Sequence, residues 1–292
     1  MSYLRPTSLE SALLARQSGS QMLAGGTDVY PANAQAHGWG APRLAYADET
    51  SILDISAVDE LKGVRRVGNA IEIGALVTWH DAIQADLPAW FDCVRLAARE
   101  VGGPQIQNRG TIVGNLCNAS PAADGVPPLL ALDAKLRAQS VRGSREIALS
   151  KFVIGNRQTT LADDELVTAI IIPHIPASAQ STFLKLGARR YLVISIAMVA
   201  VVVDVEDGYI VDCRIAVGAC SAVAQRMREL EQRILGAPLD QAVGIVRASD
   251  VAELQPLDDI RASAQYRREA ALELLRRALA TLVQAGGHAD AA

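Results

Sequence analysis

The residues best suited to chemistry lie in one polar segment, residues 110–124, which reads GTIVGNLCNASPAAD. Gly110 and Gly114 let backbone N–H groups approach a ligand closely, which is how many proteins bind a phosphate without a dedicated charge. Hydroxyl, amide and carboxylate side chains between and after them add hydrogen-bonding groups. We expect a binding loop whose candidate residues are Thr111, Val113, Gly114, Asn115, Asn118, Ser120 and Asp124.

A second glycine run, residues 23–29, has the same character and follows a short apolar stretch. Its candidate residues are Leu23, Ala24, Gly25, Gly26, Thr27, Asp28 and Val29. Two such loops can close on one extended ligand, and a diphosphate flanked by polar groups suits this pattern.

Neither run fits a common nucleotide motif. The Gly-x-Gly-x-x-Gly spacing of dinucleotide-binding turns is absent, and so is the Gly-Lys-Ser/Thr of the phosphate-binding loop of nucleotide hydrolases. Either run taken alone is equally well explained as a tight turn. Asp28 and Asp124 likewise fit either a helix cap or a ligand contact.

The sequence gives little support for nucleophilic catalysis or for metal binding. The four histidines, at positions 37, 80, 174 and 288, form no nucleophile-and-base pattern with Ser195. The four cysteines, at 93, 117, 213 and 220, contain no Cys-x-x-Cys pair for zinc or an iron–sulfur cluster. We therefore expect no catalytic residues and no metal site in this chain.

Composition places the chain among globular proteins of about two domains. It has 292 residues, 50% of them hydrophobic, and a net charge of −4. This charge offers no basic face for nucleic acid, and no apolar run reaches the roughly 20 residues of a membrane span. With scattered cysteines and no export signal, the chain is expected in the cytoplasm, although a signal on a partner would allow export.

Hydrophobic periodicity predicts small α/β units in the first part of the chain. Thr7 and Glu10 form a capping box ahead of a helix over 8–17. Further helices are predicted over 28–36, 78–85, 88–101 and 127–134, and strands over 51–55, 135–141, 145–149 and 166–172. Residues 63–75 alternate around Gly68-Asn69 and predict a hairpin.

Prolines 173 and 176 mark the best domain boundary, because proline disrupts both helices and central strands. Beyond them, strands are predicted over 181–186, 197–205 and 210–219, then helices over 224–235, 241–247 and 263–283. Strands followed by helices indicate an α+β unit with helices on one face of an antiparallel sheet. Residues 286–292 are expected to be a disordered tail.

The two loops, their order and the SAQYRR sequence at 263–268 resemble the FAD-binding subunits of the molybdenum hydroxylase family. This family includes xanthine dehydrogenase, aldehyde oxidoreductase and aerobic carbon monoxide dehydrogenase. The resemblance covers nearly the whole chain and implies a fold of the vanillyl-alcohol-oxidase type. Two α/β FAD-binding subdomains, at 1–56 and 57–176, would precede an α+β domain at 177–285 that covers the flavin.

The resemblance implies that both loops bind the diphosphate and ribityl of FAD, and it adds Ile172 and Lys185 to the site. Electrons would arrive from [2Fe-2S] clusters on a partner and leave to NAD or another acceptor. The implied partners are an iron–sulfur subunit and a large molybdopterin subunit, with a dimer of heterotrimers as one arrangement. The alternatives are a self-sufficient FAD oxidase of the same fold and a cofactor-free binding module.

One position departs from the family pattern, because Val113 stands where a second glycine is common. The cysteines also cannot form the four-cysteine cluster site of the benzoyl-CoA reductase branch, which disfavours that branch.

Overall fold

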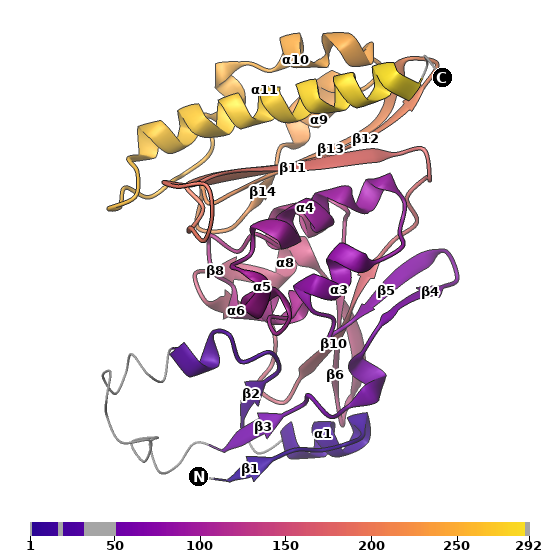
Figure 1. Cartoon of the computed structure of the whole chain (residues 1–292), viewed down its shortest axis with the longest axis vertical. Coiled ribbons are helices and arrows are strands. Elements are labelled where there is room, and N and C mark those ends of the chain that lie inside the picture. Colours follow the sequence, from indigo (N-terminus) through magenta and orange to yellow (C-terminus); the bar gives the residue numbers. More distant parts are fainter. Residues whose placement is uncertain (1, 17–19, 32–50, 290–292) are drawn as a thin grey trace.

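The computed structural model describes residues 2–16, 20–31 and 51–289. Three sheets follow one another along the long axis of the molecule, with the amino-terminal sheet at one end and the carboxy-terminal sheet at the other (Figure 1). No helix in these ranges is long and apolar enough to cross a membrane. Of the helix predicted over 28–36, residues 29–31 are helical and 32–36 lie outside the described residues.

The first sheet is small and parallel. Strand β3 (Ile52–Asp54) lies between β1 (Tyr3–Leu4) and β2 (Gln21–Leu23), and helix α1 (Leu9–Arg16) connects β1 to β2. Both sides of β3 are paired, and its three residues are buried. The sheet delivers the first glycine loop directly from the end of β2.

The second sheet is antiparallel and has the order β4-β5-β10-β6-β7. Its strands are β4 (Val64–Val67), β5 (Ala70–Gly74), β6 (Lys135–Ser140), β7 (Gly143–Ala148) and β10 (Leu166–Ile172). The β4–β5 hairpin turns at Gly68, whose φ of 59° lies in the left-handed region that glycine adopts readily. The hairpin forms as predicted.

Helices between β5 and β10 surround this sheet. They are α3 (Trp79–Gln84), α4 (Asp92–Glu100), α5 (Pro104–Gln107), α6 (Ile112–Asn118), α7 (Val126–Ala131) and α8 (Leu149–Phe152), with a ribbon of β8 (Val153–Gly155) and β9 (Gln158–Thr159). Single 3-10 turns occur at Asp59–Leu61, Ala89–Phe91, Leu239–Gln241 and Ala248–Val251.

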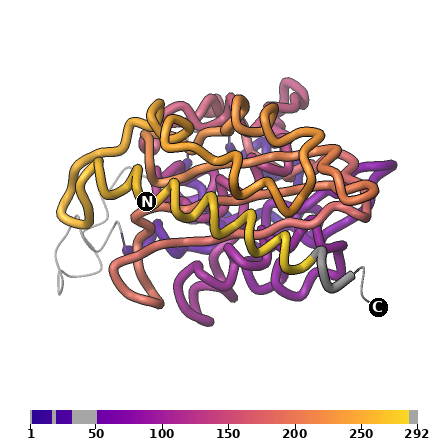
Figure 2. The backbone as a smooth tube through the Cα atoms, turned by 90° about the horizontal axis from the view of Figure 1, so that it is seen from above, coloured from indigo at the N-terminus to yellow at the C-terminus, as the bar shows by residue number. Residues whose placement is uncertain are grey.

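The third sheet has the order β11-β12-β13-β14 and is antiparallel. Its strands are β11 (Gln180–Leu186), β12 (Ala197–Glu206), β13 (Tyr209–Gly218) and β14 (Gln225–Arg226), and the helices that follow are α9 (Arg228–Ile234), α10 (Ala242–Ile245) and α11 (Ala264–Ala289). Seen from above, α11 runs obliquely across the strands (Figure 2).

Both faces of this third sheet are buried. In β12, Val199 and Val201 pack with α11 and α9, whereas Ala200 and Val202 join the core around α4 and α7. Two buried faces explain why β12 is an almost continuous apolar run and not an alternating one. The predicted arrangement of helices on one face holds within this segment, and the second face is covered by helices from earlier in the chain.

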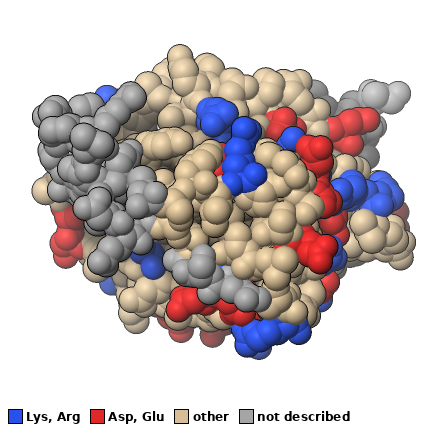
Figure 3. Space-filling model, turned by 90° about the horizontal axis from the view of Figure 1, so that it is seen from below, with Lys and Arg blue, Asp and Glu red and all other residues tan. Residues whose placement is uncertain are grey.

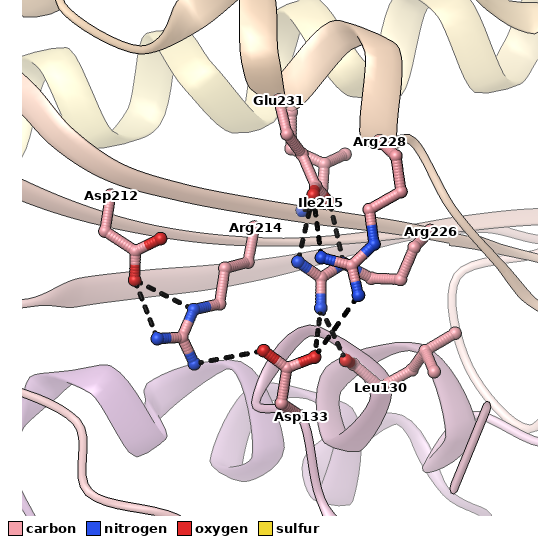
Figure 4. A network of polar contacts seen from close by, with 8 residues as sticks. All are labelled: Leu130, Asp133, Asp212, Arg214, Ile215, Arg226, Arg228 and Glu231. Carbon is pink, nitrogen blue, oxygen red and sulfur yellow. Dashed lines mark hydrogen bonds and ion pairs between the residues drawn. The ribbon is translucent and has the colours of Figure 1, made fainter. Parts of the chain in front are cut away.

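A polar network also links the third sheet to α7. Arg226 donates to the Leu130 carbonyl at 3.1 Å and pairs with Asp133 at 2.6 Å and Glu231 at 2.6 Å (Figure 4). Its side chain is 6% exposed, as is that of Glu231, so these charges are satisfied by each other and not by water. The third sheet is therefore held to α7 by charge pairing as well as apolar packing.

Three predicted segments differ in the structure. In the helix predicted over 224–235, Gln225–Arg226 instead form strand β14 at the edge of the third sheet, and α9 begins only at Arg228. Residues 112–118, predicted as loop, form helix α6, because Thr111 caps a run that buries Ile112 and Leu116. Helix α11 continues to Ala289, four residues into the predicted tail, because the preceding turns are anchored by buried Leu275, Leu279 and Leu282. Residues 290–292 lie outside the described residues.

Candidate cofactor site

Both glycine loops line the same cavity, which has a volume of about 530 Å³ and lies between the first and second sheets. Eleven of the predicted binding residues form part of its wall: Ala24, Gly25, Gly26, Thr27, Asp28, Val29, Thr111, Val113, Gly114, Asn115 and Asn118. Residues more than 80 positions apart in sequence thus meet at one site.

The first loop leaves the buried end of β2 and packs against the second. A Cβ atom on Gly25 would lie 2.0 Å from the carbonyl oxygen of Arg109, so only glycine allows this approach. Gly26 has a φ of 77°, and a side chain there would collide with the ring of Tyr30. Both glycines are therefore required by backbone geometry.

The second loop is organised by the start of α6. Thr111 caps this helix by accepting a hydrogen bond from the Gly114 N–H at 3.0 Å. The side-chain oxygen Oδ1 of Asn115 accepts a hydrogen bond from the Gly125 N–H at 3.2 Å, which fixes the segment after the helix. Val113 is 5% exposed and packs into the core, although it also contributes to the cavity wall.

One side-chain contact joins the two loops directly. Asn118 donates to the Asp28 carboxylate at 2.9 Å, and its own oxygen accepts from Arg157. Asp28 is thus held by the other loop, in addition to its place on the cavity wall. The link between the loops makes the shape of the cavity depend on both.

The first loop has unused hydrogen-bond donors. Within the part of the chain that the structure describes, the backbone N–H groups of Gly25, Gly26 and Thr27 have no acceptor. Buried or half-buried N–H groups without a partner are rare, because each costs free energy. A run of such donors beside glycines suits the oxygen atoms of a diphosphate.

Another part of the cavity wall is formed by residues that the sequence did not single out. Arg16 donates to the carbonyl oxygens of Ser20 and Glu165, and Leu166 and Val167 begin strand β10 there. The Glu165 carboxylate accepts two hydrogen bonds from Arg145, which hold its pKa below the usual range. The cavity-lining residues of this group are Arg16, Ser20, Gln21, Met22, Leu161, Glu165, Leu166 and Val167.

The remaining wall residues complete the enclosure. Apart from Gly110 and Cys117, which belong to the polar segment, nothing in their local sequence signals a binding role: Ile55, Ala75, Trp79, Val101 and Ile106. Trp79 is 2% exposed and packs in the hydrophobic core beside the cavity.

Five predicted residues do not line this cavity. Leu23 is buried at the end of β2, Ile172 is buried at the end of β10, and the Ser120 hydroxyl accepts a hydrogen bond from the Ala122 N–H. Asp124 and Lys185 bind each other elsewhere. The strand β10 residues on the cavity are Leu166 and Val167, five residues or more before Ile172.

Asp124 and Lys185 form a buried cluster with Ser195. The Lys185 ammonium lies 2.6 Å from one Asp124 oxygen, and the Ser195 hydroxyl donates to the other at 2.5 Å. Lys185 also donates to the Glu100 carbonyl at the end of α4, at 3.4 Å. Burial raises the pKa of the Asp124 carboxyl despite the neighbouring ammonium. This cluster joins α4, the segment before α7 and the third sheet.

The cavity has the chemistry of a dinucleotide site and not of a metal site. Within the described ranges, no group of three or more His, Cys, Asp or Glu side chains is placed to hold a metal ion. The geometry combines glycine loops, free N–H donors and a long polar-to-apolar wall. It defines a protein that binds an extended phosphate-containing cofactor.

Comparisons with known proteins identify the family. Residues 1–175 match the model of the FAD binding domain in molybdopterin dehydrogenase, and residues 182–282 match the CO dehydrogenase flavoprotein C-terminal domain. The nicotine 6-hydroxylase medium subunit of Paenarthrobacter nicotinovorans is 32% identical over 97% of this chain and 96% of its own. The xanthine dehydrogenase FAD-binding subunit of Escherichia coli O157:H7 is 31% identical over 98% and 97%.

A solved structure has the same fold. Carbon monoxide dehydrogenase from Oligotropha carboxidovorans aligns with a TM-score of 0.83 and 29% identity, covering 96% of each chain. The chain belongs to the FAD-binding medium subunits of the molybdopterin hydroxylase family, and its α+β fold is that of this family. It is an oxidoreductase subunit, and FAD is its family's cofactor.

Proposed function

We propose that this chain holds FAD in the 530 Å³ cavity and relays electrons within a larger enzyme complex. When bound, FAD would supply the redox chemistry of this relay, which would lead from the [2Fe-2S] clusters of a partner to NAD or another acceptor. The observation that carries the proposal is the meeting of both glycine loops at one cavity, inside a chain that matches the family over nearly its whole length.

The chain's own residues supply binding and orientation. The free N–H groups of Gly25, Gly26 and Thr27 would donate to the diphosphate, and Thr111, Gly114 and Asn115 would bound it from the other side. The Asp28–Asn118 contact keeps the loops together. Leu166 and Val167 would add apolar surface to the wall of the same cavity.

The five residues away from the cavity act on it indirectly in this proposal. Lys185, Asp124 and Ser195 hold the third sheet against α4, whose following residues Val101 and Ile106 line the cavity. Leu23, Ser120 and Ile172 shape the backbone that leads to it. In this proposal, Lys185 and Asp124 support the wall of the cavity and do not contact the cofactor directly.

The domain division and the assembly are part of the same proposal. We place FAD-binding subdomains at 1–56 and 57–176 and a covering domain at 177–285. The partners would be an iron–sulfur subunit and a molybdopterin-binding large subunit, with a dimer of heterotrimers as the arrangement. Four free cysteines support a reducing compartment such as the cytoplasm.

The test is the flavin content of the purified full chain. We expect one FAD per chain by absorbance, either as isolated or after incubation with FAD and desalting. Gly25→Ala should lose most of this FAD, whereas Gly244→Ala, which meets no neighbouring atom, should keep it. A parent chain that takes up no FAD would overturn the proposal. Turnover of an organic substrate by the isolated FAD-loaded chain would favour a self-sufficient oxidase instead.

A further inference from the structure

The SAQYRR sequence at 263–268 contains a buried arginine that does not line the cofactor cavity. Arg267 is 4% exposed and lies in the first turn of α11, at the end of the third sheet where β11 connects to β12 (Figure 1). On the face of the molecule shown in Figure 3, in contrast, Lys and Arg side chains reach the surface beside Asp and Glu side chains. A buried guanidinium has lost its hydration, so fixed acceptors must replace the water.

Three such acceptors surround the Arg267 guanidinium. Its Nη1 atom donates to the carbonyl oxygens of Ile196 at 2.7 Å and of Ala219 at 3.1 Å. Its Nη2 atom donates to the Asp259 carboxylate at 2.8 Å. Ile196 directly precedes strand β12 and Ala219 directly follows strand β13, and these two strands are neighbours in the sheet. The rigid, planar guanidinium therefore holds the two strand ends in a fixed relation.

Both strand ends also contact the segment 121–124, which follows α6 in the second glycine loop. The Ser195 hydroxyl, next to the first of these carbonyl groups, donates to Asp124 at 2.5 Å. The Ala219 N–H donates to the Pro121 carbonyl at 3.2 Å. The buried guanidinium is thus connected, through one residue at each strand end, to both ends of this segment.

The segment 121–124 leads directly to the cofactor cavity. Asn115 and Asn118 of α6 line the cavity, and the Gly125 N–H, directly after the segment, donates to Oδ1 of Asn115 at 3.2 Å. Helix α6 is therefore joined to the segment twice, along the chain and through this hydrogen bond. A displacement of the segment would move a wall of the cavity.

The backbone is strained at two of these junctions. Ala119, between α6 and the segment, has a φ of 48°, and Ala219 has a φ of 60°. Non-glycine residues in this left-handed region persist where surrounding contacts hold them. Both backbone groups of Ala219 have such contacts, because its carbonyl accepts from Arg267 and its N–H donates to Pro121.

We propose that Arg267 is a positioning residue for FAD binding, which holds the segment 121–124 and, through it, the α6 wall of the cofactor cavity. This inference rests on the proposed function. Arg267 acts through the Ile196 and Ala219 carbonyls and does not contact the cofactor. The affinity for FAD therefore depends on the third sheet as well as on the two glycine loops.

The experiment measures the FAD dissociation constant of the full chain by fluorescence titration, with circular dichroism to show that each variant is folded. Arg267→Gln removes the charge, and Arg267→Lys keeps the charge without the planar guanidinium. Arg268→Gln is the matched control, because the neighbouring Arg268 is half-buried and donates to the Leu254 carbonyl at 3.1 Å. Ser195→Ala removes one of the two contacts with the segment and leaves Arg267 in place.

We expect Arg267→Gln to bind FAD about tenfold more weakly, Arg267→Lys to recover part of this loss, and Arg268→Gln to bind FAD as the parent chain does. The effects of Arg267→Gln and Ser195→Ala on the dissociation constant should be non-additive, because both changes act on the same segment. If Arg267→Gln does not fold, Arg267→Lys compared with Arg268→Lys gives the same test, with weaker binding expected in the first variant alone.

A purely structural role of Arg267 predicts lower stability with unchanged FAD affinity in the folded variants, and this result would overturn the proposal. Equal loss of affinity in the Arg268 control, or strictly additive effects of the Arg267 and Ser195 changes, would also overturn it. A parent chain that takes up no FAD contradicts the proposed function. Equal affinity in the parent chain and Arg267→Gln contradicts only the role of Arg267.

Discussion

The cofactor cavity and the buried Asp124–Lys185–Ser195 cluster both draw on one stretch of sequence, yet they are opposite environments. Residues 111–118 face a cavity through glycines and amide groups, whereas Asp124, six residues later, is buried against an ammonium group. The cavity has donors without partners, and the cluster has partners for every charge. A polar residue in such a segment can therefore either line the ligand cavity or stabilise the fold through a buried ion pair. The groups that surround its side chain decide between these two roles.

The largest expected effect on stability is that of replacing Asp124, in the buried cluster, by alanine. The Lys185 ammonium, 4% exposed, would lose its carboxylate partner, and an unpaired buried charge costs about 3–5 kcal/mol. Urea denaturation should show this loss in the free energy of unfolding. Asp124→Leu combined with Lys185→Met should recover most of it, because the pair is then removed as a unit. If Asp124→Ala lost FAD without loss of stability, the role of Asp124 would be ligand binding and not stabilisation of the fold.

Gly25→Ala, in contrast, should weaken FAD binding more than it lowers the stability of the fold. The added Cβ would lie 2.0 Å from the Arg109 carbonyl oxygen, so the two loops must separate. We expect about 1–3 kcal/mol of destabilisation together with at least tenfold weaker FAD binding. Fluorescence titration with FAD measures the affinity, and thermal unfolding measures the stability. Equal FAD affinity in Gly25→Ala and Gly244→Ala would contradict the assigned loop contact.

Thr111→Ala separates capping from ligand binding. Loss of the Thr111 cap on α6 should cost about 1 kcal/mol of stability, as should Thr78→Ala at the cap of α3. Of these two threonines, only Thr111 lines the cofactor cavity. FAD affinity should therefore fall in the first variant and stay unchanged in the second. The same titration checks both.

The smallest effect is expected from Glu165→Gln and depends on pH. The Arg145 guanidinium lowers the pKa of Glu165 in the folded state, so the charged carboxylate stabilises the fold above the usual pKa of a glutamate. That contribution is lost as the pH falls through the lowered value. The variant should be less stable near neutral pH by no more than about 1 kcal/mol and should show a flatter decline in acid. Asp164→Asn, in a more exposed pair with Arg142, should change the profile less.

Local pattern was sufficient for most elements. The hairpin at Gly68, the cap at Thr78 and the long strands β12 and β13 follow from turn chemistry, capping residues and apolar runs. Helix α6 escaped prediction because its Gly114 and Asn115 are poor helix formers, and only the buried contacts of Ile112 and Leu116 stabilise it. Tertiary packing decided the conformation where propensity was weak.

Val113 illustrates the same limit within the site. Because the family commonly has glycine where this chain has Val113, the sequence suggested that the backbone approaches the diphosphate differently here. In the structure Val113 is 5% exposed and its side chain packs in the core, whereas Gly25 and Gly26 occupy positions where a Cβ atom would collide with Arg109 and Tyr30.

The sequence by itself determined that this chain has two glycine loops of binding type and an α+β fold, because glycine spacing and apolar period are local properties. Only the tertiary structure decided which polar residues share a cavity. Arg16, Glu165 and Val167 enter the wall, and Asp124 and Lys185 leave it for a buried ion pair. Burial and pairing depend on segments distant in the chain, and no local pattern encodes the neighbour that a side chain will meet.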